Sequence, residues 1–141
     1  MDPYADPMTR FVIDAPTVLH LIDNEVRIDP SIQLVAPSSI RSEAMQVLLR
    51  DVSEGRRTDK AALETHDRIT ELKMRLLGDR VSRGTAWRIA RQRGWDTLRD
   101  AEYLAITRLQ ADALVTVDPD LAAKAEGTVP VAPLHDLLHG E

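Results

Sequence analysis

The sequence predicts one α/β domain with a mostly parallel central sheet, and three observations support this prediction. Short apolar runs of four or five residues alternate along the chain with longer segments whose apolar residues recur at helical spacing. At 141 residues the chain is long enough for one hydrophobic core but too short for two domains of ordinary size. No stretch approaches the roughly 20 apolar residues that span a bilayer. We therefore expect a sheet that is buried between helices on both faces.

Four apolar runs are the candidate strands. They are residues 10–14, 33–36, 113–117 and 129–132. The third run, Ala-Leu-Val-Thr-Val, has the clearest strand pattern. Pro130 cannot donate a hydrogen bond to a neighbouring strand, so we expect the fourth run at an edge of the sheet.

Six segments have helical spacing. They are residues 15–25, 39–54, 59–77, 83–93, 97–110 and 118–126. Ser39 is a suitable N-cap for the second helix, and Gly55 ends that helix. Because only a short link separates the second helix from the third, we expect the two to form an antiparallel hairpin.

The two ends of the chain differ from its body. The opening MDPYADPMTR has two prolines, two aspartates and no apolar run, which excludes a secretory signal. We expect residues 1–9 to form a flexible arm, residues 10–135 to form the single domain and residues 136–141 to form a tail. The absence of cysteine removes disulfides and thiol catalysis. Together these features indicate a cytoplasmic protein that is not associated with a membrane.

Two aspartates directly follow predicted buried strands. Asp14 ends the run Phe-Val-Ile-Asp, and Asp118 follows Leu-Val-Thr-Val. In open parallel sheets, binding sites form where the carboxyl ends of strands meet the starts of helices. Each aspartate alone is also a good helix N-cap beside a proline. The presence of both at strand ends favours a shared site.

Glu43 and Asp100 lie near the starts of predicted helices. Glu43 borders the buried stripe of its helix, and a capping box does not explain it because the residue three positions earlier is Ile40. A favourable interaction with the helix dipole is the alternative for Glu43. Asp100 suits a ligand position, but it also fits a capping box that begins at Thr97.

Three further acids lie close to these candidates. Asp96 is a secondary candidate that is also a possible cap of the helix carrying Asp100. Asp120 is the other secondary candidate. It is either a supporting metal ligand beside Asp118 or a residue that interacts only with the helix dipole. Glu102 points away from Asp100 on the helix, and we expect it to be solvated.

The chemistry of this acidic set indicates a divalent metal. Carboxylates that converge repel one another unless a cation neutralises them, and oxygen ligands alone select hard ions such as Mg²⁺ or Mn²⁺. Such an ion, with open positions for water and phosphate, suits the hydrolysis of a phosphodiester bond. The four histidines have no metal-ligand spacing with the acids, and cysteine is absent, so zinc is not expected.

The basic residues are unevenly distributed. The net charge is −5, yet fifteen of the 18 basic residues and only eleven of the 23 acidic residues lie between Arg41 and Arg108. Arginines in the second half of this region are candidates for binding RNA phosphates. They are Arg80, Arg83, Arg88, Arg91 and Arg99. By charge alone, a solvated helix face with protein contacts is an equally good interpretation.

With these residues in view, the sequence resembles the PIN-domain ribonucleases, and among them the toxins of VapBC toxin–antitoxin pairs. The likeness runs from Phe11 to about Ala132. Four segments carry it, in this order: Phe-Val-Ile-Asp14, Ser38-Ser-Ile-Arg-Ser-Glu43, Asp100-Ala-Glu-Tyr-Leu-Ala105 and Leu114-Val-Thr-Val-Asp118. The resemblance implies a three-layer α/β/α sandwich with a protruding helix hairpin.

The resemblance also implies a function and a set of site residues. It makes Asp14, Glu43, Asp100 and Asp118 the metal-site acids, and it makes Thr116 a hydroxyl that helps to position the site. It implies RNA hydrolysis that depends on Mg²⁺, with Mn²⁺ as a possible substitute. A homodimer and a small antitoxin are the implied partners, with their contacts concentrated on residues 38–77.

Two other functions remain open at this point. A phosphoacceptor receiver domain also gathers acids around Mg²⁺ at strand ends, but it needs a lysine just after a late strand. Lys60, Lys73 and Lys124 do not have that position. The second alternative is a PIN-fold binding module without catalytic activity, and the intact set of acids weighs against it.

Overall fold

The computed structural model describes residues 8–138. Its strands are β1 (Thr9–Ile13), β2 (Ile32–Pro37), β3 (Arg75–Leu77) and β4 (Ala113–Val115). Its α-helices are α1 (Ala15–Asp23), α2 (Ile40–Ser53), α3 (Asp59–Glu71), α4 (Arg80–Arg93), α5 (Arg99–Gln110) and α6 (Pro119–Ala125), followed by the 3₁₀ helix η1 (Leu134–Leu137). No helix within residues 8–138 is long and apolar enough to cross a bilayer.

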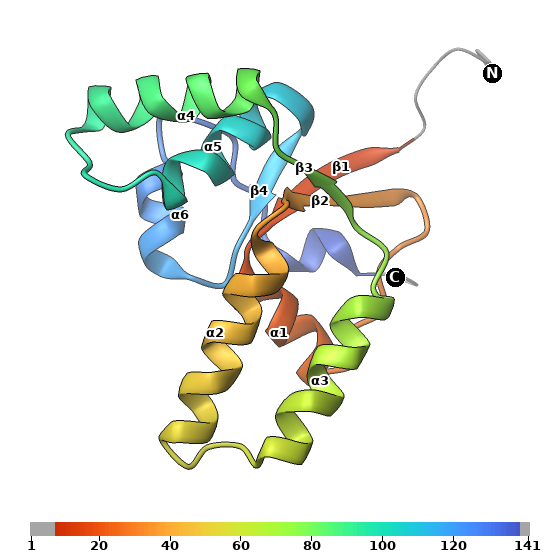
Figure 1. Ribbon diagram of the computed structural model, residues 1–141. Helices are drawn as coiled ribbons and strands as arrows, with labels where there is room; N and C mark the ends of the chain where they lie inside the picture. The colour runs from red at the N-terminus through yellow and green to blue at the C-terminus, as the bar shows by residue number, and fades with distance from the viewer. Residues whose placement is uncertain (1–7, 139–141) are drawn as a thin grey trace.

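The strands form one parallel sheet in the order β3-β2-β1-β4 (Figure 1). Strand β1 is central, and it pairs Phe11 with Leu34 of β2 and with Ala113 of β4. This order puts the carboxyl ends of β1 and β4 side by side. The predicted α/β class with a parallel sheet is therefore confirmed.

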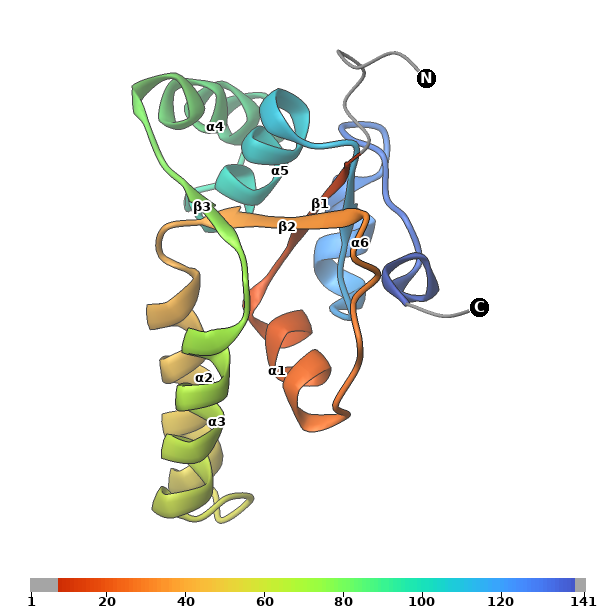
Figure 2. The ribbon, with the colours of Figure 1, turned by 90° about the vertical axis from the view of Figure 1, so that its right-hand side faces the viewer.

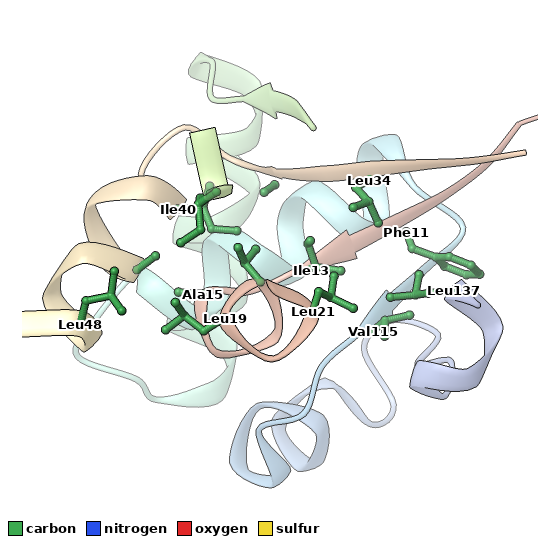
Figure 3. Packing of buried hydrophobic residues seen from close by; sticks show 14 of the residues in the cluster. Phe11, Ile13, Ala15, Leu19, Leu21, Leu34, Ile40, Leu48, Val115 and Leu137 are labelled. Atoms are coloured by element: carbon green, nitrogen blue, oxygen red, sulfur yellow. The ribbon is translucent and has the colours of Figure 1, made fainter. Parts of the chain in front are cut away.

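The sheet is buried on both faces because successive side chains of each strand point to opposite sides. Phe11 and Ile13 of β1 pack in a core that includes side chains from α1, α2, α3 and η1 (Figure 3). Val12 lies between them in sequence and packs in a second core with side chains from α4, α5 and α6. The result is the predicted three-layer α/β/α sandwich, which Figure 2 shows from the side.

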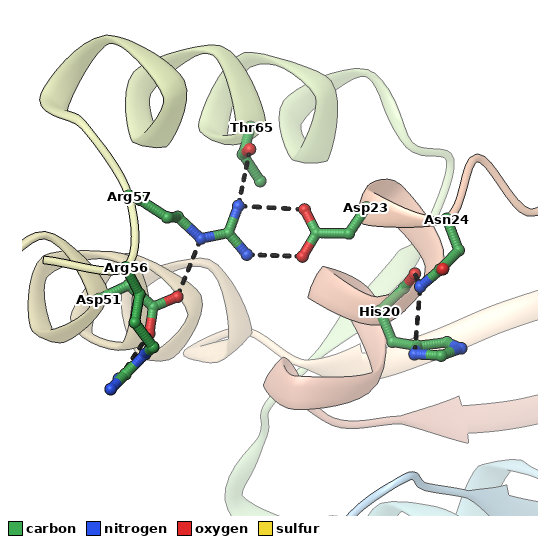
Figure 4. Close-up of polar contacts among 7 residues, drawn as sticks. All are labelled: His20, Asp23, Asn24, Asp51, Arg56, Arg57 and Thr65. Atoms are coloured by element: carbon green, nitrogen blue, oxygen red, sulfur yellow. Dashed lines mark hydrogen bonds and ion pairs between the residues drawn. The ribbon is translucent and has the colours of Figure 1, made fainter.

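Helices α2 and α3 form the predicted hairpin, which extends away from the sheet (Figures 1 and 2). Gly55 follows α2 with a φ of 78°, a left-handed conformation that favours glycine. The guanidinium of Arg57 joins the hairpin to α1: it donates to Asp51 of α2, Thr65 of α3 and Asp23 of α1 (Figure 4). These contacts fix the loop end of the hairpin against the C-terminal end of α1.

The predicted helix 59–77 is wrong in its last part. Helix α3 ends at Glu71, and residues 75–77 form the edge strand β3, which pairs Leu76 with Ala36 of β2. The run Arg-Leu-Leu is too short to show the alternation that marks a strand. Its conformation is set by pairing with β2, which the sequence does not reveal locally.

The remaining boundaries differ in smaller ways. Segment 129–132 lies beside β4 as expected for an edge, but within the described residues it makes only an isolated bridge between Leu114 and Val131. The domain continues past residue 135, because Leu137 is completely buried in the core. Residues 1–7 of the predicted arm lie outside the described part of the chain, and Thr9 already belongs to β1.

Candidate metal centre and nucleic-acid interface

Asp14 is the buried centre of the candidate site. It follows β1 and caps α1, with Oδ1 accepting hydrogen bonds from the backbone N–H of Thr17 at 3.3 Å and from the Thr17 hydroxyl. Its Oδ2 accepts from the Thr116 hydroxyl at 2.8 Å. The residue is only 2% exposed. Asp14 can thus have both predicted roles: its Oδ1 caps α1, and its Oδ2 faces Thr116 in the candidate site.

Two threonines join the end of β1 to the loop that follows β4. The Thr116 hydroxyl donates to Asp14 and accepts from the backbone N–H of Asp118 at 3.0 Å. The Thr17 hydroxyl also contacts Asp14 and accepts from the N–H of Val117 at 3.0 Å. Asp14 and Asp118 are therefore held on either side of Thr116. The positioning role that the family resemblance implied for Thr116 agrees with this arrangement.

Asp118, like Asp14, uses one carboxylate oxygen to cap the helix that follows it. Its Oδ1 caps α6 by accepting from the N–H of Asp120 at 2.9 Å. Its Oδ2 has no hydrogen-bond partner within residues 8–138. One oxygen of Asp118 therefore remains available to a ligand.

Burial raises the pKa of Asp14, and the hydrogen bonds from Thr17 and Thr116 oppose this rise. No lysine, arginine or histidine in the described part of the chain pairs with Asp14. A buried carboxylate without a cation is costly in free energy, so this position is suited to a bound cation.

Glu43 lies in the first turn of α2 and is held by three side chains. Its Oε2 accepts from the Ser39 hydroxyl at 2.8 Å and from the Tyr103 hydroxyl at 3.2 Å. Its Oε1 accepts from Nε of Arg99 at 2.8 Å. Ser39 therefore binds the Glu43 side chain and does not cap the helix backbone. These contacts, rather than the helix dipole alone, determine the orientation of Glu43.

Tyr103 is a site residue that the sequence did not reveal. It is 1% exposed on the buried face of α5, and burial together with the charges of Glu43 and Asp14 raises the pKa of its hydroxyl. It therefore stays neutral and donates to Glu43. The available signal was Tyr103 as the one aromatic side chain among the buried residues of α5.

Asp100 lies in the first turn of α5 and contacts two basic side chains. Its Oδ2 accepts from Nζ of Lys124 at 2.7 Å, and its Oδ1 is 3.9 Å from a terminal nitrogen of Arg99. The capping-box alternative is not realised, because α5 begins after Leu98 without a side-chain cap. Asp100 therefore lies against positively charged side chains, in an environment that also suits a metal ligand.

Lys124 of α6 lies within the acidic set. The hydrogen bond that it donates to Asp100 raises the pKa of its ammonium group, and the charges of Asp120 and Asp118 raise it further. The Lys124 ammonium also lies 5.5 Å from the ring centre of Trp95. The charge of Asp120 thus contributes to the electrostatic potential at Lys124. Asp96 has no hydrogen bond or ion pair within residues 8–138, so its role as a secondary candidate stays a prediction.

The acids are arranged in two groups, with basic side chains beside one of them. Asp14 and Asp118 form the first group with Thr116, and Glu43 and Asp100 form the second with Arg99 between them. As positioned in residues 8–138, no three acidic or histidine side chains are close enough together to coordinate one ion. The donor set is nevertheless composed of oxygen atoms, and Asp14 has no cation partner, so the residues fit Mg²⁺ or Mn²⁺.

The five arginines predicted to bind RNA have different environments. Arg80, Arg83 and Arg91 are exposed on α4 and form no hydrogen bond or ion pair within the described chain. Arg88 donates to Thr85 of its own helix at 3.2 Å. Arg99 contacts Glu43 and so belongs to the acidic site. The first three are therefore the arginines available to an external phosphate.

Solved structures with the same arrangement of elements were found. PAE2754 from Pyrobaculum aerophilum is 22% identical, with a TM-score of 0.71 over 92% of this chain and 94% of that one. VapBC-1 from nontypeable Haemophilus influenzae is 12% identical, with a TM-score of 0.60 over 89% of this chain and 98% of that one. The chain has the PIN-domain fold. No protein-family model matches the sequence. Curated proteins gave no significant match either.

The PIN-domain fold that the family resemblance implied is thus confirmed. At these identities the likeness establishes the fold alone, so the roles of Asp14, Glu43, Asp100 and Asp118 stay predictions. The PIN fold does account for their position, because the carboxyl ends of β1 and β4 and the starts of α2 and α6 meet at one edge of the sheet.

Lys124 provides a test of this site in the PIN fold that does not depend on catalysis. If Asp100 is a metal ligand, the Lys124 ammonium would compete with the ion and repel it, so Lys124→Met is expected to raise Mg²⁺ affinity by about tenfold. Isothermal titration of RNA-free protein measures the change. Lys60→Met, an exposed lysine on α3, is the matched control and should leave the affinity unchanged. A lower affinity in Lys124→Met would show that Lys124 positions Asp100 for the metal.

Proposed function

We propose that the protein is a Mg²⁺-dependent endoribonuclease that acts as the toxin of a type II toxin–antitoxin pair. The observation that carries this proposal is Asp14, a buried carboxylate at the end of the central strand that is joined to Asp118 through Thr116 and lacks a cation partner within residues 8–138. In a PIN fold this position suits a metal-dependent nuclease. Mn²⁺ is expected to substitute for Mg²⁺.

The residues of the site have distinct tasks in this proposal. Asp14 and Asp118 are the principal metal ligands, and Asp100 and Glu43 complete the acidic set. When bound, the ion would lower the pKa of a coordinated water and stabilise the leaving oxygen of the phosphodiester. Thr116 holds Asp14 in orientation. Tyr103 and Ser39 hold Glu43.

The hairpin surface supports the proposed protein partners. Met45 and Leu49 of α2 and Leu63 of α3 are 36%, 60% and 58% exposed, within residues 38–77. Apolar side chains in this number on a protruding hairpin favour contact with a second copy of the chain or with a small antitoxin. The similarity to VapBC-1 supports an antitoxin as a partner. The cytoplasm is the compartment in which such a toxin would act.

One observation favours a second candidate function. Lys124 and Arg99 contact Asp100 and Glu43, as they would in a binding module that had exchanged the metal for internal cations. Such a module would keep the PIN fold without catalytic activity. A receiver domain has no comparable support, since the chain has the PIN-domain fold.

Divalent-dependent cleavage of RNA distinguishes these functions. Purified protein should cleave a labelled RNA with Mg²⁺ or Mn²⁺ and should not cleave it in EDTA. Asp118→Asn is the matched variant, because asparagine keeps the cap of α6 but removes the charge. Equal cleavage by both proteins would trace the activity to a contaminant, and absence of cleavage by the wild type at saturating metal would favour the binding module.

A further inference from the structure

Helix α4 carries an exposed tryptophan among several arginines. The helix sequence is RVSRGTAWRIARQR, with five arginines and no acid. Trp87 is 61% exposed, and it is the largest side chain among the exposed hydrophobic residues of the described chain. Tryptophan is enriched at binding surfaces, because its ring offers a large contact area to a ligand. Helix α4 is the outer helix of its layer in Figure 1, so its outer face is open to such a ligand.

The free arginines of α4 flank this tryptophan. Arg83 and Arg91 lie four residues before and after Trp87, and Arg80 lies seven residues before it. At about 100° per residue, the four side chains fall within an arc of about 80° on the helix. Within residues 8–138 none of the three arginines forms a hydrogen bond or ion pair. The stripe therefore presents one ring between guanidinium groups, of which that of Arg83 also lies near the charges of Asp79 and Glu102.

This stripe begins next to the acidic site. A hollow of about 200 Å³ between the start of α2 and α4 is lined by Ser39, Arg83 and Glu102, among others. Ser39 donates to Glu43, so the hollow adjoins the acidic site. Burial, followed by the charge of Glu43, raises the pKa of Glu102, and Arg83 opposes the rise. Glu102 is thus half-buried beside Glu43, and the expectation that it is solvated was wrong.

We propose that Trp87 stacks on an unpaired base of the RNA while Arg83 and Arg91 bind the flanking phosphates. The inference rests on the proposed function, and it adds to it one base-stacking residue and the arginines that flank it. An aromatic ring cannot stack on the face of a base that is paired within a duplex, whereas every unpaired base offers a free face. Guanidinium groups on either side of the ring suit bidentate contacts with the phosphates that flank such a base.

A protein partner is less well matched to this surface. On the hairpin, the exposed apolar residues Met45 and Leu49 line one shallow hollow, as expected for a protein contact. Trp87 instead lies in a stripe whose nearest exposed neighbours on the same arc are arginines. Charge complementarity with a polyanion therefore favours RNA over a protein as the ligand of the α4 stripe.

The test is equilibrium binding in EDTA, where cleavage does not contribute. Fluorescence anisotropy of a labelled single-stranded RNA should show that Trp87→Ala weakens binding by about tenfold or more, the effect of losing one stacked base. Trp87→Phe should recover part of the loss because the ring is kept. Val81→Ala is the control, because Val81 is 60% exposed on the same helix but lies outside the arc of Trp87 and the arginines, and it should bind like the wild type. Arg91→Gln should lower the slope of log Kd against log salt by about one.

Several results would overturn the inference. They are unchanged single-strand affinity in Trp87→Ala, equal losses for single-stranded and duplex RNA, no RNA binding by the wild type, and an altered oligomeric mass of the variant in light scattering. The last would assign Trp87 to a protein contact. Failure of the proposed function has a different signature, since Trp87-dependent RNA binding would then persist without any Mg²⁺-dependent cleavage.

Discussion

Replacement of Asp14 by asparagine is expected to reduce Mg²⁺-dependent RNA cleavage by about a thousandfold, because a metal ion contributes several kcal/mol to transition-state stabilisation. Asparagine has nearly the same shape and keeps an oxygen that can accept from the N–H of Thr17, so α1 should stay capped. The loss should therefore appear in the rate constant of single-turnover cleavage and not in the content of folded protein.

The matched control for this prediction is Asp67→Asn. Asp67 is an acid on α3 whose side chain is 81% exposed, and its replacement removes the same charge at a distance from the carboxyl edge of the sheet. Its rate should equal that of the wild type. A loss of similar size in both variants would point to net charge and RNA attraction rather than to a metal ligand.

The same Asp14→Asn substitution is expected to stabilise the metal-free protein at pH 7, by about 1 kcal/mol, as is common when a functional site is relieved of an unfavourable group. Burial raises the pKa of Asp14 above its ordinary value of 3.8, so ionisation costs more free energy in the folded state than in the unfolded chain. Urea unfolding in EDTA measures the difference.

The pH and metal dependence of this stability follow from the sign of the pKa shift. As pH rises from 3.8 through the raised pKa of folded Asp14, the wild type loses stability, and the advantage of Asp14→Asn grows over that window. Below 3.8 both proteins carry a neutral side chain, and the advantage disappears. With Mg²⁺ at about 100 times its Kd, the wild type alone gains about 2.7 kcal/mol. Equal stabilisation of both proteins by Mg²⁺ would contradict the role of Asp14 as a ligand.

Much of the fold follows from local sequence patterns, and the part that does not has a physical reason. The central strand and the strand before Asp118 are short apolar runs between helices, and burial on both faces dictates that pattern. Strand β3 has three residues, and it is a strand only because Val35, Ala36 and Pro37 of β2 pair with it. Pairing between segments that are distant along the chain is invisible to a local pattern.

The residues of the candidate site also fall into those that the sequence predicts and those that only the folded structure reveals. Asp14 and Asp118 were found because strand ends and helix starts are readable from the sequence. Glu43 was found because no cap explained it. Tyr103 and Lys124 were missed, since their contacts with Glu43 and Asp100 join residues 60 and 24 positions apart. Only the folded chain brings those side chains to the acids.

The central claim is that the carboxyl edge of this sheet binds a catalytic divalent ion through Asp14 and Asp118. Anomalous diffraction from crystals soaked in Mn²⁺ tests it most directly. The account predicts a manganese peak about 2 Å from a carboxylate oxygen of Asp14, with an oxygen of Asp118 bound directly or through one water. A crystal saturated with Mn²⁺ that shows no peak between these aspartates, with Lys124 still paired to Asp100, would contradict it.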